Sequence, residues 1–377
     1  MPKNNEARRI AAVADASGQA ALAAEVRRLR RENATLSGQS GDWKRLAQEF
    51  AAAAPTLPMP RKLRASGTPK LERMDAVLLL GDCHANERWT QAQTDGLTQY
   101  DFGRFCSSLW VLCRDVIRKI EELRPLYGLS TLHLDLMGDI THGKLRLDDE
   151  VTNEFATVPA VAQTSWVLYQ AVLLLLEHFE HIEIKCVAGN HGRLHDKPQS
   201  KRHVEENLDT LIYCWLASLL GVRGLSPGRV GITIPGSRLY TFRRLGHKVL
   251  LAHGDHVRGG NSIAGLPIYG LSRDILRNLS RQVKAAREKE GLAIIEFGHF
   301  HQSNLLEDLM FINGAMCPTG PWAMDEMGAF AEPKQWLYLT SERRAYSWTL
   351  PLSLKGATEV PHGFGAVPDD IVPATMG

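Results

Sequence analysis

Five short hydrophobic runs along the chain are each followed directly by glycine or histidine and then by polar residues. The runs are Ala76–Leu80, Thr131–Met137, Ile182–Ala188, Lys248–Ala252 and Leu292–Phe297. Short apolar runs bounded by turn residues predict buried β-strands. In open α/β sheets, binding sites form just beyond the carboxyl ends of the strands. We therefore expect five strands that deliver the residues following them to one edge.

Longer segments between these runs have helical patterns, and further short runs follow in the last third of the chain. The expected helices are Tyr100–Arg124, Pro159–His181, Val204–Leu220 and Ile268–Glu290. The further expected strands are Val230–Ile234, Arg238–Phe242, Leu309–Asn313, Gln335–Thr340 and Ala345–Leu350. Strands that alternate with helices predict an α/β fold.

The residues after the five short runs include the types that bind divalent cations. They read Gly81-Asp82-Cys83-His84, Gly138-Asp139-Ile140-Thr141-His142-Gly143, Gly189-Asn190-His191-Gly192, His253-Gly254-Asp255 and Gly298-His299-Phe300-His301. Mixed oxygen and nitrogen ligands suit Mn, Fe, Zn or Co better than Mg or Ca. Asp82 and His84 are two residues apart, so an extended backbone would point both side chains the same way. His299 and His301 repeat this spacing.

In their order along the chain and in their residues, these motifs resemble those of the calcineurin-like metallophosphoesterase superfamily. The resemblance covers Ala76 to Leu350. The resemblance implies two packed mixed β-sheets flanked by helices, and two divalent cations with Mn as the expected metal. It assigns Asp82, His84, Asp139 and His301 to the first metal, and Asp139, Asn190, His253 and His299 to the second. It also places the catalytic histidine at His191, which would protonate the leaving alcohol or stabilise the transition state.

Some neighbouring residues are candidates for contact with the substrate. Serine/threonine phosphatases of the superfamily carry Gly-Asp-x-x-Asp-Arg-Gly, whereas this chain has Thr141-His142-Gly143 and lacks that arginine. Arg193 is a candidate for supplying the missing charge, and the alternative is a surface arginine on a loop. His142 is a candidate for a hydrogen bond that orients a metal ligand, or for contact with the substrate. Arg258, in a glycine-rich segment, is a third candidate.

Charge is distributed unevenly over the 377 residues. Residues 1–70 hold 13 Lys/Arg against 6 Asp/Glu, which leaves 31 against 36 in the rest. This asymmetry suggests a polyanionic or acidic partner. We expect a helical basic extension and linker over 1–70, a metallophosphoesterase domain over 71–350 and an irregular tail over 351–377. Nucleic-acid contact, self-association through the N-terminal helices and a solvated arm all stay open for the extension.

The remaining composition is that of a cytoplasmic protein. The start is polar and alanine-rich, so we expect no signal peptide, and the longest apolar stretch, Ala171–Leu176, is too short to span a membrane. Six cysteines without paired spacing indicate reduced thiols.

The residues in and around the motifs also resemble those of phage or prophage-type phosphoesterases related to DNA-repair exonucleases. This resemblance would place the protein in the cytoplasm of a bacterial host. The segments that carry this likeness are Val187–Arg193, His253–Asp255 with Arg258–Asn261, Gly298–Gln302 and Glu332–Thr340. The first hypothesis is therefore a two-metal nuclease acting on DNA. The alternatives are a small-molecule or cyclic-nucleotide phosphodiesterase or phosphomonoesterase, and a DNA-binding, replication-associated scaffold.

Overall fold

The structure is a computed structural model that describes most of the chain beyond residue 70. The described residues are 24, 27, 45–52, 71–144, 151–195, 202–257, 266–267, 269–273, 292–327 and 330–368. The chain divides into two compact units, Met1–Glu49 and Phe50–Gly377. Within 1–70 all the described residues are helical, and the rest of the expected extension lies outside the described part. The boundaries at residues 70 and 350 stay predictions.

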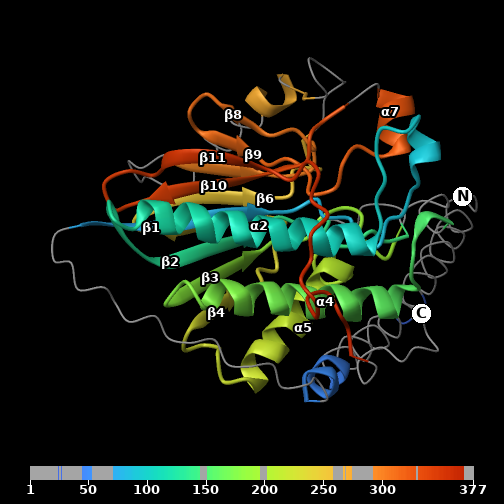
Figure 1. The fold of residues 1–377 in the computed structure, drawn as a ribbon, viewed down its shortest axis with the longest axis horizontal. Helices are drawn as coiled ribbons and strands as arrows, with labels where there is room; N and C mark the ends of the chain where they lie inside the picture. The colour runs from blue at the N-terminus through green and yellow to red at the C-terminus, as the bar shows by residue number, and fades with distance from the viewer. Residues whose placement is uncertain are drawn as a thin grey trace, which may run out of the picture. The chain divides into compact units, whose positions relative to one another are not determined.

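The larger unit contains two β-sheets (Figure 1). The first has the strand order β11-β10-β1-β2-β3-β4 and the second β5-β6-β7-β9-β8. The strands are β1 (Glu72–Leu80), β2 (Tyr127–Leu136), β3 (His181–Cys186), β4 (Val230–Thr233), β5 (Leu239–Arg244), β6 (His247–Ala252), β7 (Ile294–Phe297), β8 (Asn304–Leu306), β9 (Met310–Ile312), β10 (Lys334–Thr340) and β11 (Ser347–Ser353). The helices are η1 (Gln91–Thr94), α2 (Phe102–Leu123), α4 (Thr157–Leu176), α5 (Leu208–Val222) and α7 (Pro321–Met327).

Both sheets are mixed, as expected. Strands β1 to β4 pair in parallel, whereas β10 and β11 add antiparallel pairs at one edge. In the second sheet, β6, β7 and β9 are parallel, and β5 and β8 flank them antiparallel. The expected fold class, two mixed sheets flanked by helices, is confirmed.

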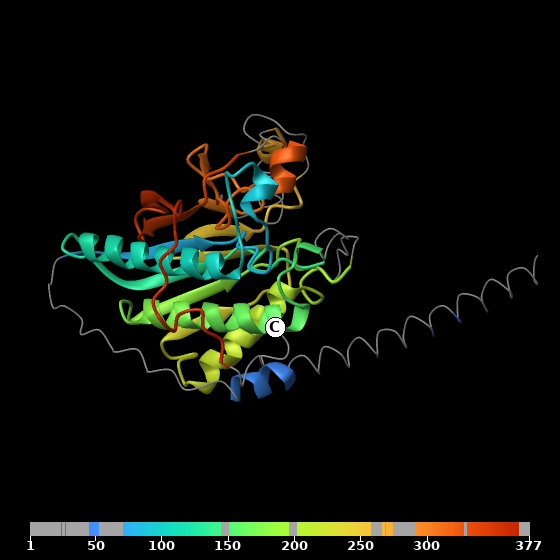
Figure 2. The same ribbon diagram turned by 45° about the vertical axis from the view of Figure 1, so that its right-hand side comes forward.

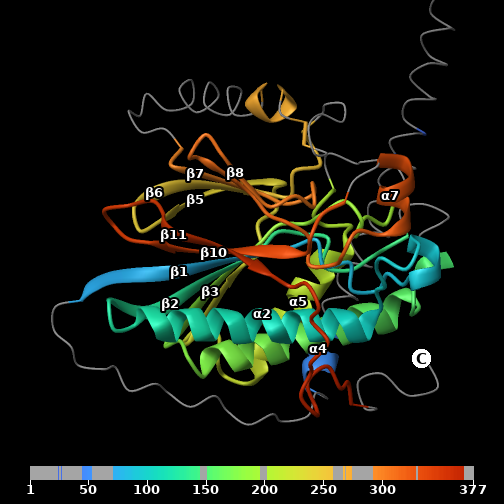
Figure 3. The ribbon, with the colours of Figure 1, turned by 45° about the horizontal axis from the view of Figure 1, so that its top comes forward.

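Alternation along the central strands fills two different layers of the core. Val77 and Leu79 of β1 pack with Val249, Leu251 and residues of β9 and β10 between the sheets. The intervening Leu78 lies with Leu80 on the opposite face, against α2, α4 and α5. Figure 3 shows these helices on the side of the first sheet that faces away from the second sheet.

Polar groups are also buried between the sheets. Arg244, at the end of β5, binds Asp135 of β2, Glu296 of β7 and Tyr338 of β10. The two carboxylates are fully buried, so the cation that pairs with them is required to offset their desolvation. This network ties strands of one sheet to strands of the other.

The helices begin where their caps dictate. The Asp101 side chain accepts from the Arg104 amide and starts α2, and the Asn207 side chain accepts from the Asp209 amide and starts α5. The second cap explains why α5 begins at Leu208 and not at the expected Val204. Figure 2 shows α5 beside α4. Phe50 stacks on Trp215 of α5 with ring centroids 4.4 Å apart.

Other sequence expectations need correction. The helix expected to reach His181 ends at Leu176, because β3 begins at His181. Strand β8 and helices η1 and α7 were not expected. Of the helix expected over Ile268–Glu290, only residues 269–273 are described, and these are helical. Among the described helices, α4 alone is long and apolar enough to cross a membrane, but most of it is buried, as in many core helices.

Candidate metal centre

The expected ligands come from both sheets. Asp82, Asp139 and Asn190 follow parallel strands β1, β2 and β3 of the first sheet. His253 follows β6 of the second sheet, and His299 follows β7, which is parallel to β6. The carboxyl ends of both sets of parallel strands meet at one edge, so the polar residues of all five motifs come together.

Around His253, ligand atoms from both sheets are in direct contact. His253 Nε2 lies 3.0 Å from Asp139 Oδ2 and 3.0 Å from Asn190 Oδ1. Ligand atoms of Asp139, His253 and His299 lie within 4.8 Å of one another. The other ring nitrogen of His253 is 2.8 Å from the Met137 carbonyl, which it can reach as a donor. That hydrogen bond orients the ring so that Nε2 faces the carboxylate.

A second group of ligand atoms surrounds His84. Atoms of Asp82, His84 and Asp139 lie within 4.8 Å of one another, and all three residues are buried. His301 Nε2 is 3.4 Å from Asp82 Oδ1 and 3.3 Å from His84 Nε2. Cys317, in the loop after β9, places its sulfur within the same 4.8 Å of His84 and His301. Cys317 lies outside the five motifs, so no sequence pattern indicates that it belongs to this group.

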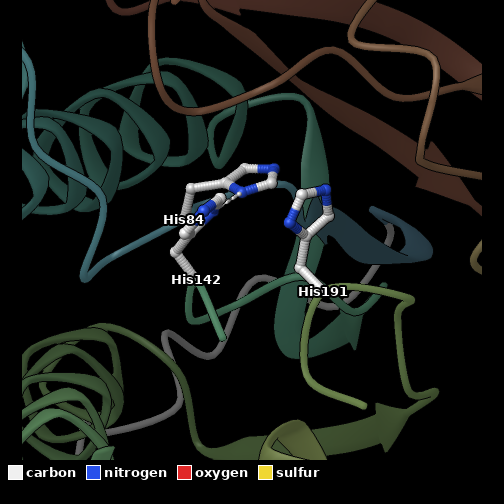
Figure 4. Close-up of side chains that lie close together, drawn as sticks. All are labelled: His84, His142 and His191. Atoms are coloured by element: carbon white, nitrogen blue, oxygen red, sulfur yellow. Dashed lines mark hydrogen bonds between the residues drawn. The ribbon is translucent and has the colours of Figure 1, made fainter. Parts of the chain in front are cut away.

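His191 and His142 lie against His84 (Figure 4). The ring centroid of His191 is 4.7 Å from that of His84 and 4.8 Å from that of His142. The His191 amide donates to Asp139 Oδ1 over 2.7 Å. His142 Nδ1 is 3.1 Å from His84 Nδ1 and 3.5 Å from Glu87 Oε2. His142 is therefore placed where it orients His84 and borders the expected catalytic histidine.

Of the two arginines expected to contact the substrate, Arg193 lies within the described residues and Arg258 does not. Arg193 forms an isolated β-bridge with Asn207, and its partly buried guanidinium lies within electrostatic reach of Asp139 and Asp255. Burial lowers the pKa of Arg193, although the carboxylates oppose this shift. Arg258, as well as Lys197 and Lys201 of the loop after His191, lies outside the described residues. A substrate role for Arg193 stays a prediction.

The backbone at the ligands is not extended, so that part of the sequence argument is wrong. Asp82, His84, Asp139, His299 and His301 have φ angles of 48°, 47°, 49°, 72° and 55°. Side chains are disfavoured in this left-handed region, at a cost of about 1–3 kcal/mol each. The ligands converge because tight turns follow the strands, and not because alternate residues of an extended segment share a face.

A carboxylate outside the motifs holds two of these turns together. Asp209 is fully buried at the start of α5. Its Oδ2 accepts from the amides of Asp139 and Gly189 over 2.8 and 2.9 Å, and its Oδ1 from the Ile140 amide over 3.0 Å. Burial and the neighbouring Asp139 raise the pKa of Asp209 to about 7.

Close packing of the turns explains one glycine directly. A Cβ on Gly189 would lie 2.1 Å from Asp139 Oδ1 and 2.3 Å from the Asp139 amide nitrogen. No side chain fits at this position while Asp139 keeps its place. Gly189 therefore lets the turn after β3 approach the turn after β2.

The charges of the cluster favour cation binding. Burial disfavours a protonated His253, but the Asp139 carboxylate outweighs burial and raises its pKa to about 10. Burial and His253 lower the pKa of His299 to about 4, and burial with His191 lowers that of His84. A divalent transition metal requires neutral imidazoles beside carboxylates, which His84 and His299 supply directly and His253 supplies once the metal displaces its proton. The donor set therefore fits the two metals that the motifs predict.

Comparisons with known proteins add little to this geometry. No protein-family model and no curated protein matches the chain. Among solved structures, a conserved uncharacterized protein from Streptococcus pneumoniae, described as a predicted phosphoesterase, aligns with 74% of this chain and 98% of its own at 12% identity and a TM-score of 0.25. Vps29 from Entamoeba histolytica complexed with Zn²⁺ aligns with 74% and 99% at 11% identity and a TM-score of 0.28.

A third similar structure is phosphopantetheinyl hydrolase from Mycobacterium tuberculosis, with 77% and 100% coverage, 10% identity and a TM-score of 0.24. At such low values the similarities do not establish an activity. The function is therefore argued from the residues of the site.

Proposed function

We propose that the protein is a two-metal phosphoesterase that hydrolyses phosphodiester bonds in nucleic acid, with DNA as the expected substrate. The observation that carries the proposal is the convergence of the side chains predicted to bind metal at one edge of both sheets. Carboxylate, amide and imidazole groups meet there within hydrogen-bonding distance, and Asp82, His84, Asp139, His299 and His301 have left-handed backbone. Strain of this kind clusters at functional sites.

Each residue has a role that its position supports. Asp139 contacts both groups of ligands, so it is the residue to bridge two cations, for which Mn²⁺ is the first candidate. When bound, two divalent cations would supply Lewis-acid activation of water and of the phosphoryl group. His191 is held through its amide on Asp139, with its ring beside His84. Its proposed role is to donate a proton to the leaving oxygen or to stabilise the transition state.

The choice of a nucleic acid rests on charge. Arg193 lies within electrostatic reach of Asp139, where a guanidinium can neutralise a backbone phosphate without reading sequence. The basic excess of residues 1–70 points to the same class of partner.

The test is an assay with Mn²⁺ on labelled single- and double-stranded DNA and on bis(p-nitrophenyl) phosphate, with Asp139→Asn as the control. We expect cleavage of DNA by the wild type and none by the variant. Turnover of the small diester alone would replace the nuclease with a small-molecule phosphodiesterase. If neither substrate is cleaved and Asp139→Asn leaves DNA binding unchanged, a scaffold role would replace both.

A further inference from the structure

A cavity of about 340 Å³ lies beside the turn that carries His253. Its walls come from the segment before α5 with His203 and Glu205, the turn before β5 with Ser237 and Arg238, and His256 after β6. Its volume falls in the range of small-molecule binding sites, about 300–1,000 Å³. None of these residues belongs to the groups of metal ligands described above.

Two arginines and two acidic residues lie at or near the cavity, and the two arginines lie within electrostatic reach of each other. Arg238 Nη2 lies 2.5 Å from Asp255 Oδ2, two residues after His253. Arg193 is within electrostatic reach of the same Asp255 and of Arg238. Arg238 thus pairs with the Asp255 carboxylate, whose side chain is 9% exposed, and Arg193 is within electrostatic reach of that carboxylate, while Glu205 on the cavity wall is exposed. An arginine has five N–H donors, so this pairing leaves donors available for an anion.

A buried polar atom gives an independent indication of a ligand. His203 lines the cavity, and 4% of its surface is exposed. Its Nδ1 has no hydrogen-bond partner among the described residues, and its Nε2 is 3.4 Å from the Ala188 carbonyl. Arg193 Nε is likewise buried without a partner in this part of the chain. Buried nitrogen atoms without partners are uncommon in folded proteins and point to a missing ligand or water.

We propose that this cavity, together with Arg193 within electrostatic reach of its Arg238, is an anion subsite that receives the phosphate next to the scissile one. The substrate class is then a phosphodiester with a second phosphate on the neighbouring nucleotide, such as an oligonucleotide. The inference rests on the proposed function. It deepens that function by separating oligonucleotides from isolated diesters, because only the former reach both the metal centre and the subsite.

The experiment compares His203→Gln and Arg238→Gln with the wild type on two substrates. A thymidine dinucleotide with a 5′-phosphate carries the additional phosphate, and bis(p-nitrophenyl) phosphate lacks it. We expect KM for the dinucleotide to rise about 10- to 100-fold, the usual effect of losing a hydrogen bond to a charged group. Turnover of the small diester should stay within about twofold. Arg118→Gln, at an exposed position on α2, is the matched control.

Binding to the metal-free protein supplies a second measurement that does not depend on catalysis. Calorimetric titration with thymidine 5′-monophosphate should show binding to the wild type and about 10- to 100-fold weaker binding to His203→Gln and to Arg238→Gln. Equal losses on both substrates, or unchanged binding in both variants, would overturn the subsite. If the wild type cleaves neither substrate, the proposed function fails, and the nucleotide titration still decides whether the cavity binds phosphate.

Discussion

Replacing Asp209 with asparagine should weaken metal binding without removing any ligand. The carboxylate offers two oxygens to the turns after β2 and β3, whereas an asparagine offers one oxygen and one amino group. If the side-chain oxygen of the asparagine still accepts hydrogen bonds from the backbone amides of Asp139 and Gly189, its amino group faces the backbone N–H of Ile140. One hydrogen bond to a charged acceptor is then replaced by a contact between two donors.

The size of the effect follows from these contacts. A hydrogen bond to a charged group contributes about 1.5–3 kcal/mol. Because the pKa of Asp209 is raised to about 7, loss of the charge near Asp139 offsets part of this. We expect the metal-free variant to be about 1–2 kcal/mol less stable at neutral pH. Residues that orient metal ligands typically change metal affinity about 10- to 100-fold, and we expect a loss of Mn²⁺ affinity in this range.

Calorimetric titration with Mn²⁺ and unfolding in urea measure the two quantities. Asp101→Asn is the matched control, because Asp101 also lies at a helix start and caps α2, where asparagine is an equally good cap. It should change neither quantity. Wild-type Mn²⁺ affinity in Asp209→Asn would refute the reasoning, and an equal loss in Asp101→Asn would make the effect unspecific.

Three further predictions test other parts of the site. His191→Ala should bind two Mn²⁺ ions as the wild type does but turn over DNA about 10²–10⁴-fold more slowly; loss of Mn²⁺ in calorimetry would contradict its role. The pKa of His253 is raised to about 10 in the metal-free protein, so Mn²⁺ must displace its proton, and apparent affinity should increase between about pH 6.5 and pH 10. Titrations in two buffers of different ionisation enthalpy detect that proton, and identical heats would oppose the prediction. Gly189→Ala should lose Mn²⁺ binding and about 1–3 kcal/mol of stability in urea unfolding, whereas Gly221→Ala, with nothing within 4 Å of the added Cβ, should lose neither.

Much of the fold and of the ligand cluster could be predicted from the sequence, because both depend on local patterns. A buried strand appears as an apolar run, and parallel strands bring the residues that follow them to one edge. The structure places Asp82 and His299 together although 217 positions separate them. Their role as metal ligands stays a prediction.

Other groups could not be found in this way, because their importance arises only from tertiary contacts. In the sequence, Asp209 is an ordinary acidic residue in the first turn of a helix. Only the fold brings its carboxylate to the amides of Asp139 and Gly189 in the turns after β2 and β3. Asp135 and Glu296 lie within apolar runs, and only the pairing of the sheets provides Arg244 as their partner. Arg238 and His203 are distant in sequence and meet only at the wall of a cavity.

The left-handed backbone at the proposed ligands lowers the stability of the fold at the same residues that the proposed function requires. Glycine adopts positive φ without the penalty that aspartate and histidine incur. A change such as His84→Gly or His301→Gly would therefore relax the chain at that position while removing a proposed ligand. Screening variants for thermal stability alone would therefore favour loss of the metal centre. Engineering this protein for stability should keep five residues unchanged, namely Asp82, His84, Asp139, His299 and His301.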